Sequence, residues 1–123
     1  MAGFRHLHHP KASPLNALDQ YQAEAACTAI YPARFAVLYP ALGLSEEAGE
    51  VAGKISKWIR DEGGQPEKLD REAVGKELGD VLWFVSNLAY DLGYSLSDIA
   101  YMNIKKLQDR AARGKLQGSG DNR

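Results

Sequence analysis

The sequence predicts an all-α protein, and two observations carry this prediction. Apolar residues recur at helical spacing in four segments, whereas stretches with the character of a β-strand are hard to find. Breaker residues punctuate the chain between these segments, as at Tyr39-Pro40, Gly63-Gly64 and Gly93. Because helices joined by short connections pack as neighbours, we expect a bundle of four to five helices.

The first two expected helices are bounded by proline and glycine. One spans about residues 14–31, with Ser13 as its cap and Pro32 as its stop. The next spans about 41–61, after a proline break, and the glycine pair at 63–64 ends it. Glycine suits that position because it readily adopts the left-handed conformation that follows a helix.

The third expected helix carries a broad apolar stripe, and the fourth also has apolar residues within it. They span about residues 70–92 and 95–112, and Ser95 with Asp98 gives the second one a capping-box pattern. The apolar positions that we expect to be buried are Val74, Leu78, Val81, Leu82, Val85, Leu88, Leu92, Leu96, Ile99, Ala100, Met102 and Leu107. A bundle of this size buries limited surface, and the stripes of the second and third expected helices are wide, so we expect homo-oligomerisation to cover part of them.

Composition bounds the domain organisation and the partners. The chain has 123 residues and a net charge of −1, so no global basic field attracts nucleic acid or anionic lipid. We expect Cys27 to be a small buried residue, and no apolar run approaches the roughly 20 residues of a membrane span. A cytoplasmic protein is the expectation, with a flexible arm (1–13), a helical domain (14–113) and a disordered tail (114–123).

Two pairs of carboxylates border the apolar stripes. Glu47 and Glu50 lie one turn apart on a helix, and Glu77 and Asp80 repeat this spacing on the next one. If the two helices are antiparallel neighbours, four carboxylates converge, which is unfavourable unless a cation neutralises them or some stay protonated. Such an all-oxygen ligand set suits Mg²⁺ first and Mn²⁺ second. Each pair alone also fits a solvated helix face.

Lys54 and Trp83 are candidate substrate contacts beside these acids. Lys54 lies one turn after Glu50, where it can pair with that glutamate or contact a phosphate. Trp83 follows Asp80 by about one turn, and its ring can stack on a nucleobase or belong to the core.

A polar stripe on the fourth expected helix supplies further candidates. It consists of Asn103, Lys106 and Arg110, at positions i, i+3 and i+7. The forked guanidinium of arginine suits phosphate oxygens, and lysine supplies a point charge. The other interpretation is a solvated basic face near a helix C-terminus, which the helix dipole favours.

The pattern E-E-x-x-E at residues 46–50, followed by E-x-x-D at 77–80, resembles the MazG-like family of all-α nucleoside triphosphate pyrophosphohydrolases. The likeness runs from about residue 15 to 114 and includes the stretches YQAEAACTAIYP and NIKKLQDRAARG. It implies a helical bundle completed as a homodimer or a dimer of dimers. It also implies Mg²⁺-dependent hydrolysis of a nucleoside triphosphate to the monophosphate and pyrophosphate. House-cleaning of the nucleotide pool is a role that the same resemblance suggests.

The resemblance further implies a role for each candidate residue. The implied metal ligands are Glu47, Glu50, Glu77 and Asp80, and the implied phosphate contacts are Asn103, Lys106 and Arg110. Glu46 is an accessory acid in this scheme. We expect either Glu47 or Glu46 to orient or deprotonate the attacking water.

Two other readings remain open beside the hydrolase. A di-iron bundle protein would need Glu-x-x-His pairs on facing helices, but His6, His8 and His9 all lie in the N-terminal arm. A non-catalytic helical module that binds a nucleotide or a partner protein would use the acidic cleft structurally. Incubation with nucleotides and Mg²⁺ separates turnover from binding alone.

Overall fold

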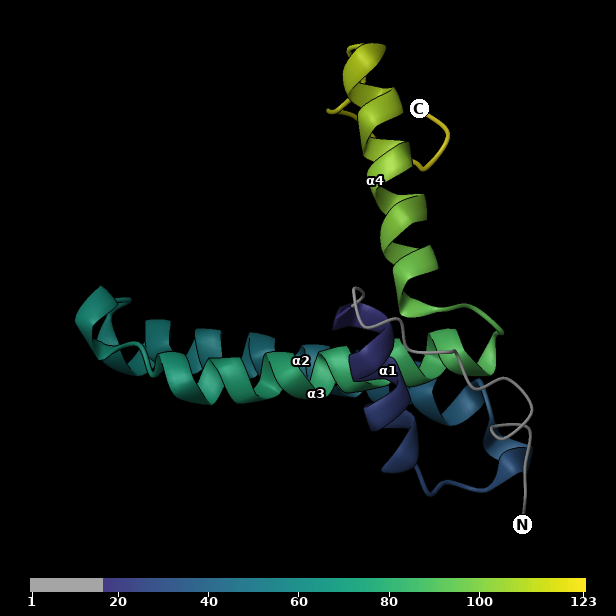
Figure 1. The fold of residues 1–123 in the computed structure, drawn as a ribbon. Coiled ribbons are helices and arrows are strands. Elements are labelled where there is room, and N and C mark those ends of the chain that lie inside the picture. The colour runs from purple at the N-terminus through teal and green to yellow at the C-terminus, as the bar shows by residue number, and fades with distance from the viewer. Residues whose placement is uncertain (1–16) are drawn as a thin grey trace.

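The computed structural model describes residues 17–123, and these residues form helices and no strand. In chain order the elements are α1 (Ala17–Cys27), the 3-10 turn η2 (Ala33–Phe35), α2 (Leu38–Glu62), the 3-10 turn η3 (Pro66–Lys68), α3 (Arg71–Asp91) and α4 (Leu96–Ala112). The all-α prediction is therefore confirmed, with four α-helices (Figure 1). The arm 1–13, its histidines and the expected cap at Ser13 lie outside the described residues.

The start of α2 corrects one expected boundary. The break expected at Tyr39-Pro40 does not occur, because α2 already begins at Leu38 and its first closing hydrogen bond runs from Ala41 N to Val37 O, at 3.1 Å. Pro40 thus falls in the first turn, where its missing N–H needs no helical partner. Conversely, α1 ends at Cys27, four residues before the expected end at 31.

The other helix boundaries follow the predicted signals. Gly63 has a φ of 63° and ends α2 in the left-handed conformation, as expected. At the start of α3 the sequence analysis named no cap, and there Asp70 accepts a hydrogen bond from Ala73 N at 2.9 Å. Ser95 and Asp98 form the predicted capping box at the start of α4.

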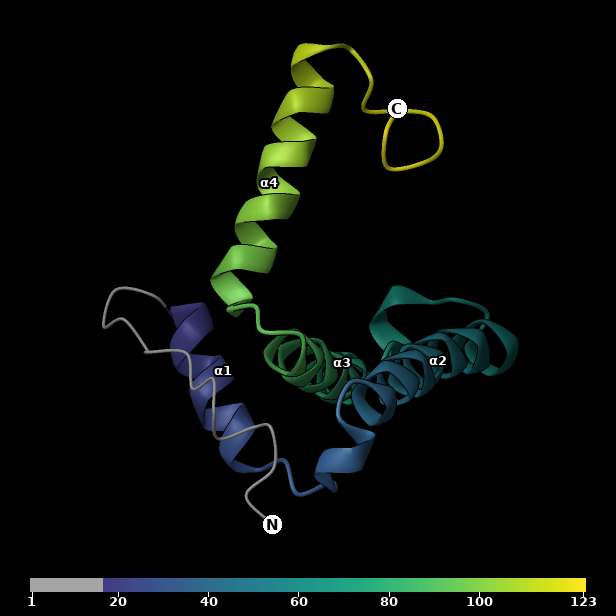
Figure 2. The ribbon, with the colours of Figure 1, turned by 90° about the vertical axis from the view of Figure 1, so that its right-hand side faces the viewer.

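Helices α2 and α3 form the long antiparallel pair of the molecule, joined through η3 (Figure 1). Helix α1 crosses the C-terminal half of α3, and α4 extends away from the α2–α3 pair (Figure 2). The two long helices approach closely at Gly43, which is buried and where a Cβ atom would overlap the ring of Phe84. The absence of a side chain at residue 43 therefore sets the spacing of the pair at this point.

Two polar residues of α1 hold the junction between α3 and α4. Gln22 is fully buried, donates to the carbonyl oxygens of Ser86 (3.3 Å) and Tyr94 (3.0 Å), and accepts from Leu96 N (3.0 Å). Asp19 accepts from the backbone and side chain of Ser97, at 2.9 and 2.8 Å. These bonds satisfy amide groups at the start of α4 that have no helical partner, so α1 fixes where α4 leaves the domain.

The core of a single chain is small, and several expected core positions are exposed. The buried hydrophobic residues among those described are Ala25, Ala89, Tyr90 and Leu96. The expectation of burial was wrong for Leu78, Leu82, Leu92, Met102 and Leu107, each of which is more than a third exposed. Cys27 is also exposed, contrary to expectation. A lone protomer therefore leaves much of its apolar stripes in contact with water.

None of the helices in the described part of the chain has the length and apolar character to cross a membrane.

Candidate functional site

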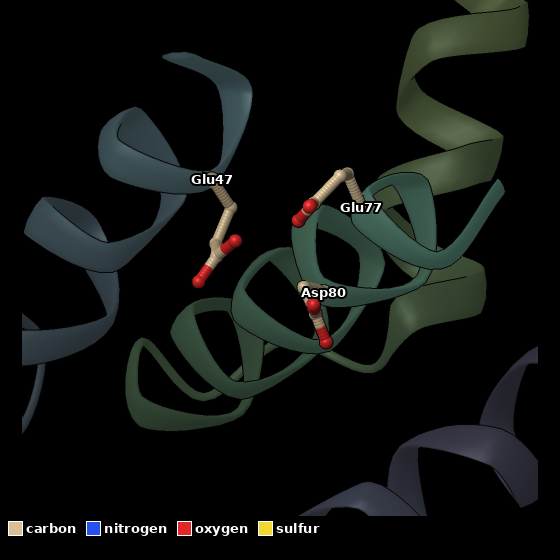
Figure 3. Close-up of side chains that lie close together, drawn as sticks. All are labelled: Glu47, Glu77 and Asp80. Carbon is tan, nitrogen blue, oxygen red and sulfur yellow. The ribbon is translucent and has the colours of Figure 1, made fainter. Parts of the chain in front are cut away.

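Three carboxylates meet in the seam between α2 and α3. Glu47 of α2 and Glu77 and Asp80 of α3 each place one oxygen within 4.8 Å of the other two (Figure 3). The expected convergence of acids from two antiparallel helices therefore occurs for three of the four residues. Glu50 is exposed and its carboxylate is outside this group, which we call the acid cluster.

The close approach of the two helices positions the acid cluster. Gly43 lies one turn before Glu47 on α2, and Phe84 lies one turn after Asp80 on α3. The contact between Gly43 and Phe84 is thus one helical turn from the point where the acids face each other. Because Gly43 has no side chain, α2 and α3 lie close enough here for carboxylates of both helices to reach one ion.

Burial and repulsion between the acids both raise the pKa of Glu47. Burial is the largest cause that raises the pKa of its carboxyl group, followed by the charges of Asp80 and Glu77. The charges of Glu46 and Glu50 raise the pKa of Glu47 further, so both acids act on the cluster although they lie outside it. A cation among these oxygens would remove this repulsion. Three carboxylates and no nitrogen or sulfur fit a hard ion such as Mg²⁺ or Mn²⁺.

Lys54 contacts the acid cluster across the seam. Its Nζ lies 3.1 Å from Glu77 Oε1, so its ion pair joins α2 to α3 and is not the pair with Glu50 considered from the sequence. Lys54 also lines a pocket of about 290 Å³ at the far end of the helix pair, together with Lys57, Trp58 and Lys68. Positive charge therefore lies directly beside the acids.

Tyr21 of α1 is close enough to the cluster for the charge of Asp80 to act on its phenol. Burial raises the pKa of its phenol, and the charge of Asp80 raises it further. The sequence analysis assigned Tyr21 no role in the site. No spacing rule could have linked it to Asp80, because the angle at which α1 crosses α3 is a property of packing.

Trp83 lies three residues after Asp80 on α3 and lines an aromatic pocket of about 420 Å³. Its Nε1 donates to Thr28 Oγ1 at 2.7 Å, and its ring meets that of Tyr31 edge-on, with centroids 6.5 Å apart. The pocket is lined by Thr28, Ile30, Tyr31, Pro32, Phe35, Tyr39 and Trp83. All of these except Trp83 come from residues 28–39, which run from the end of α1 to the first turn of α2, and the sequence did not predict a pocket there.

A strained turn at Val37 shapes this connection. Val37 has a φ of 69°, a region that a β-branched residue rarely adopts, and Leu38 N donates to Ala36 O across it at 2.8 Å. The buried Asp91 holds the turn, because one carboxylate oxygen accepts from both Val37 N (3.0 Å) and the hydroxyl of Tyr31 (2.7 Å).

The candidate phosphate contacts on α4 do not join the acid cluster of their own protomer. Asn103 is exposed, and all three contacts lie on α4, which extends away from the α2–α3 pair (Figures 1 and 2). Lys106 and Arg110 instead contact Asp121, at 3.0 and 3.2 Å.

Comparison with known proteins agrees with the geometry of the site. A model of the MazG nucleotide pyrophosphohydrolase domain matches residues 38–114, which include every member of the acid cluster. A protein of Mycobacterium phage L5, named only as the gene 37 protein, is 44% identical over 112 residues, covering 86% of this chain and 98% of its own. No solved structure matches the chain significantly.

Proposed function

The chain belongs to the MazG nucleotide pyrophosphohydrolase family, and on this premise we propose that it hydrolyses a nucleoside triphosphate to the monophosphate and pyrophosphate. The observation that carries the proposal is the acid cluster, since it lies inside the matched domain at the seam of the long helix pair. We further propose that the reaction depends on Mg²⁺, with Mn²⁺ as a substitute, and that it serves nucleotide metabolism in the cytoplasm.

Glu47, Glu77 and Asp80 are the proposed ligands of the metal ion, with Glu50 as a fourth. A triphosphate carries several negative charges and would be repelled by bare carboxylates. The bound ion supplies positive charge for the phosphate oxygens and lowers the pKa of coordinated water. Glu46 and Glu47 are the proposed residues that orient the attacking water and accept its proton, because both belong to the same turn of α2.

Lys54 and Trp83 are the proposed substrate contacts within the same protomer. Lys54 exchanges its pairing with Glu77 for a phosphate oxygen, which frees Glu77 for the metal ion. The aromatic pocket, with Trp83 in its wall, takes the nucleobase through stacking and apolar contact.

A second copy of the chain completes the proposed active site. Helix α4 exposes Tyr101, Met102, Ile104 and Leu107, with exposed fractions of 64, 52, 51 and 39%. Apolar surface of this extent on one helix favours a protein–protein contact. Association through α4 would bring the stripe Asn103, Lys106 and Arg110 toward the acid cluster of another subunit.

Disruption of that contact should yield monomers. Ile104→Glu places a charge between Tyr101 and Leu107, one turn from each on the exposed face of α4, so sedimentation or gel filtration with light scattering should report half the wild-type mass or less. Lys76→Glu, which introduces the same charge at an exposed position of α3, is the control that should keep the wild-type mass. A wild-type protein that is itself monomeric at micromolar concentration would contradict the proposed assembly.

The test of the activity is incubation with a panel of canonical and modified nucleoside triphosphates in the presence of Mg²⁺, with separate detection of pyrophosphate and phosphate. Release of pyrophosphate together with the monophosphate is the expected result. Binding of nucleotides without turnover would instead favour a non-catalytic nucleotide-binding module, and phosphate release alone would reject the proposed bond cleavage.

Metal binding should be measurable without substrate. At a Mg²⁺ concentration about 100-fold above Kd, an ion bound only by the folded chain adds about 2.7 kcal/mol of stability and raises Tm by about 5–15 °C. Glu47→Gln should raise the Tm of the metal-free protein, because it removes one of the repelling charges, and should abolish most of the response to Mg²⁺. Glu72→Gln, at an exposed site outside the cluster, should keep the full response.

A further inference from the structure

The residues that follow α4 close into a loop. Arg123 donates from Nη1 to the carbonyl oxygen of Gly120 at 2.6 Å and from Nη2 to that of Leu116 at 3.2 Å. Gly118 and Gly120 have φ values of 115° and 83°, which glycine adopts at no steric cost. Residues 116–123, the C-terminal loop, therefore turn back toward the helix that precedes them.

Three oxygen atoms of the C-terminal loop accept hydrogen bonds from one guanidinium nitrogen. Nη2 of Arg110 donates to the carbonyl oxygens of Gly120 (3.3 Å) and Asp121 (2.7 Å) and to Oδ1 of Asp121 (3.2 Å). The same Oδ1 accepts from Lys106 Nζ at 3.0 Å. A carboxylate flanked by carbonyl oxygens thus takes the position, between a lysine and an arginine, that a phosphate group would take.

Arg110 has a hydrogen-bond donor that the C-terminal loop does not use. Its side chain is 5% exposed, although it lies near the end of the most exposed helix. Its Nε is buried and has no hydrogen-bond partner among the described residues. A buried guanidinium that lacks one acceptor fits a ligand with more oxygens than the loop provides.

We propose that the C-terminal loop is an internal competitor that occupies the phosphate-binding pair Lys106 and Arg110 and is displaced by the phosphates of the substrate. The inference rests on the proposed function, because it takes these two residues as phosphate contacts. Asp121 serves as the mimic of a phosphate oxygen. Displacement by a triphosphate leaves all donors of Arg110 available to a ligand with several acceptor oxygens.

The contacts of the loop suit reversible docking. The Asp121 side chain is 81% exposed, so water and salt screen its attraction to Lys106 and Arg110. Lys106 first, and then Arg110, hold the pKa of Asp121 below its ordinary value, so the carboxylate is charged at neutral pH. A triphosphate brings more charge to the same pair than one carboxylate does.

The experiment compares full-length wild type with Asp121→Asn in calorimetric titrations with inorganic tripolyphosphate and in steady-state hydrolysis of a nucleoside triphosphate with Mg²⁺. Asp121→Asn should bind tripolyphosphate about 2- to 5-fold more tightly and show a lower KM at unchanged kcat, since exposed ion pairs contribute modestly. Glu72→Gln removes an exposed carboxylate that pairs with Lys76 on α3, away from the C-terminal loop, and it should behave as wild type.

The outcomes separate the two proposals. Equal tripolyphosphate affinity in wild type and Asp121→Asn, or no binding to either, overturns the competitor role even if hydrolysis is observed. Tighter binding to Asp121→Asn supports it, including in a protein that releases no pyrophosphate from any nucleotide, a result that would overturn the proposed function alone. Loss of tripolyphosphate binding in Arg110→Lys, with retention in Lys105→Ala, would locate the displaced contact at Arg110.

Discussion

Asp80→Asn should lower kcat for pyrophosphate release by at least about 100-fold. The substitution keeps the size of the side chain but removes a charge from the acid cluster, where Asp80 lies within 4.8 Å of Glu47 and Glu77. Loss of residues that merely support metal ligands already costs 10- to 100-fold in affinity or activity, so loss of a ligand should cost more. Stopped or coupled assays of pyrophosphate at saturating Mg²⁺ measure the effect.

Asp98→Asn is the matched control for this prediction. Asp98 belongs to the capping box of α4 and lies on another helix, so its replacement weakens a helix cap without touching the cluster. Its kcat should remain within a few-fold of wild type. Full activity in Asp80→Asn, with Mg²⁺ still required, would place the metal elsewhere.

Gly43→Ala should destabilise the protein by about 1–3 kcal/mol, the usual cost of overpacking a tight contact. The added methyl group overlaps the ring of Phe84. That ring cannot easily move aside, because it packs against Trp83 and Tyr39 with centroids 4.9 and 5.9 Å away. Denaturant unfolding measures the loss, and the Mg²⁺ response should also weaken, because the overlap occurs one turn from the acid cluster.

The same helix supplies the control. A Cβ atom at Gly53 meets nothing within 4 Å, so Gly53→Ala should raise the free energy of unfolding by up to about 1 kcal/mol through helix propensity. Gly43→Ala combined with Phe84→Leu should recover much of the lost stability, since the smaller side chain makes room. If Gly43→Ala stabilised the protein as Gly53→Ala does, the two helices would not be in contact at residue 43.

The sequence was sufficient to predict what depends on local spacing. Helical periodicity and end signals such as Gly63 and Ser95 located all four helices, because these signals act within a few residues. The sequence also predicted that Glu47 faces Glu77 and Asp80. A short connection makes consecutive helices antiparallel neighbours, and the i, i+3 spacing puts Glu77 and Asp80 on one helix face.

Contacts between distant segments could not be predicted in this way. Lys54 pairs with Glu77 and not with Glu50, because the neighbouring helix offers a closer carboxylate than the preceding turn of its own helix. The aromatic pocket depends on the course of residues 28–39, where side chains contact Trp83 through packing that no period describes. Exposure of Leu78 and Met102 was missed because an apolar pattern predicts a helix face that favours burial but does not specify that the same chain buries it.

The turn at Val37 has a consequence for ligand entry. Holding a β-branched residue at positive φ costs of order 1–3 kcal/mol, and the hydrogen bonds from Val37 N and Tyr31 to Asp91 offset this cost before any ligand arrives. One wall of the aromatic pocket is therefore preorganised. A nucleobase bound there, as we propose, would not spend binding energy on ordering residues 31–38, and discrimination among bases would depend on the shape of the pocket and not on induced fit.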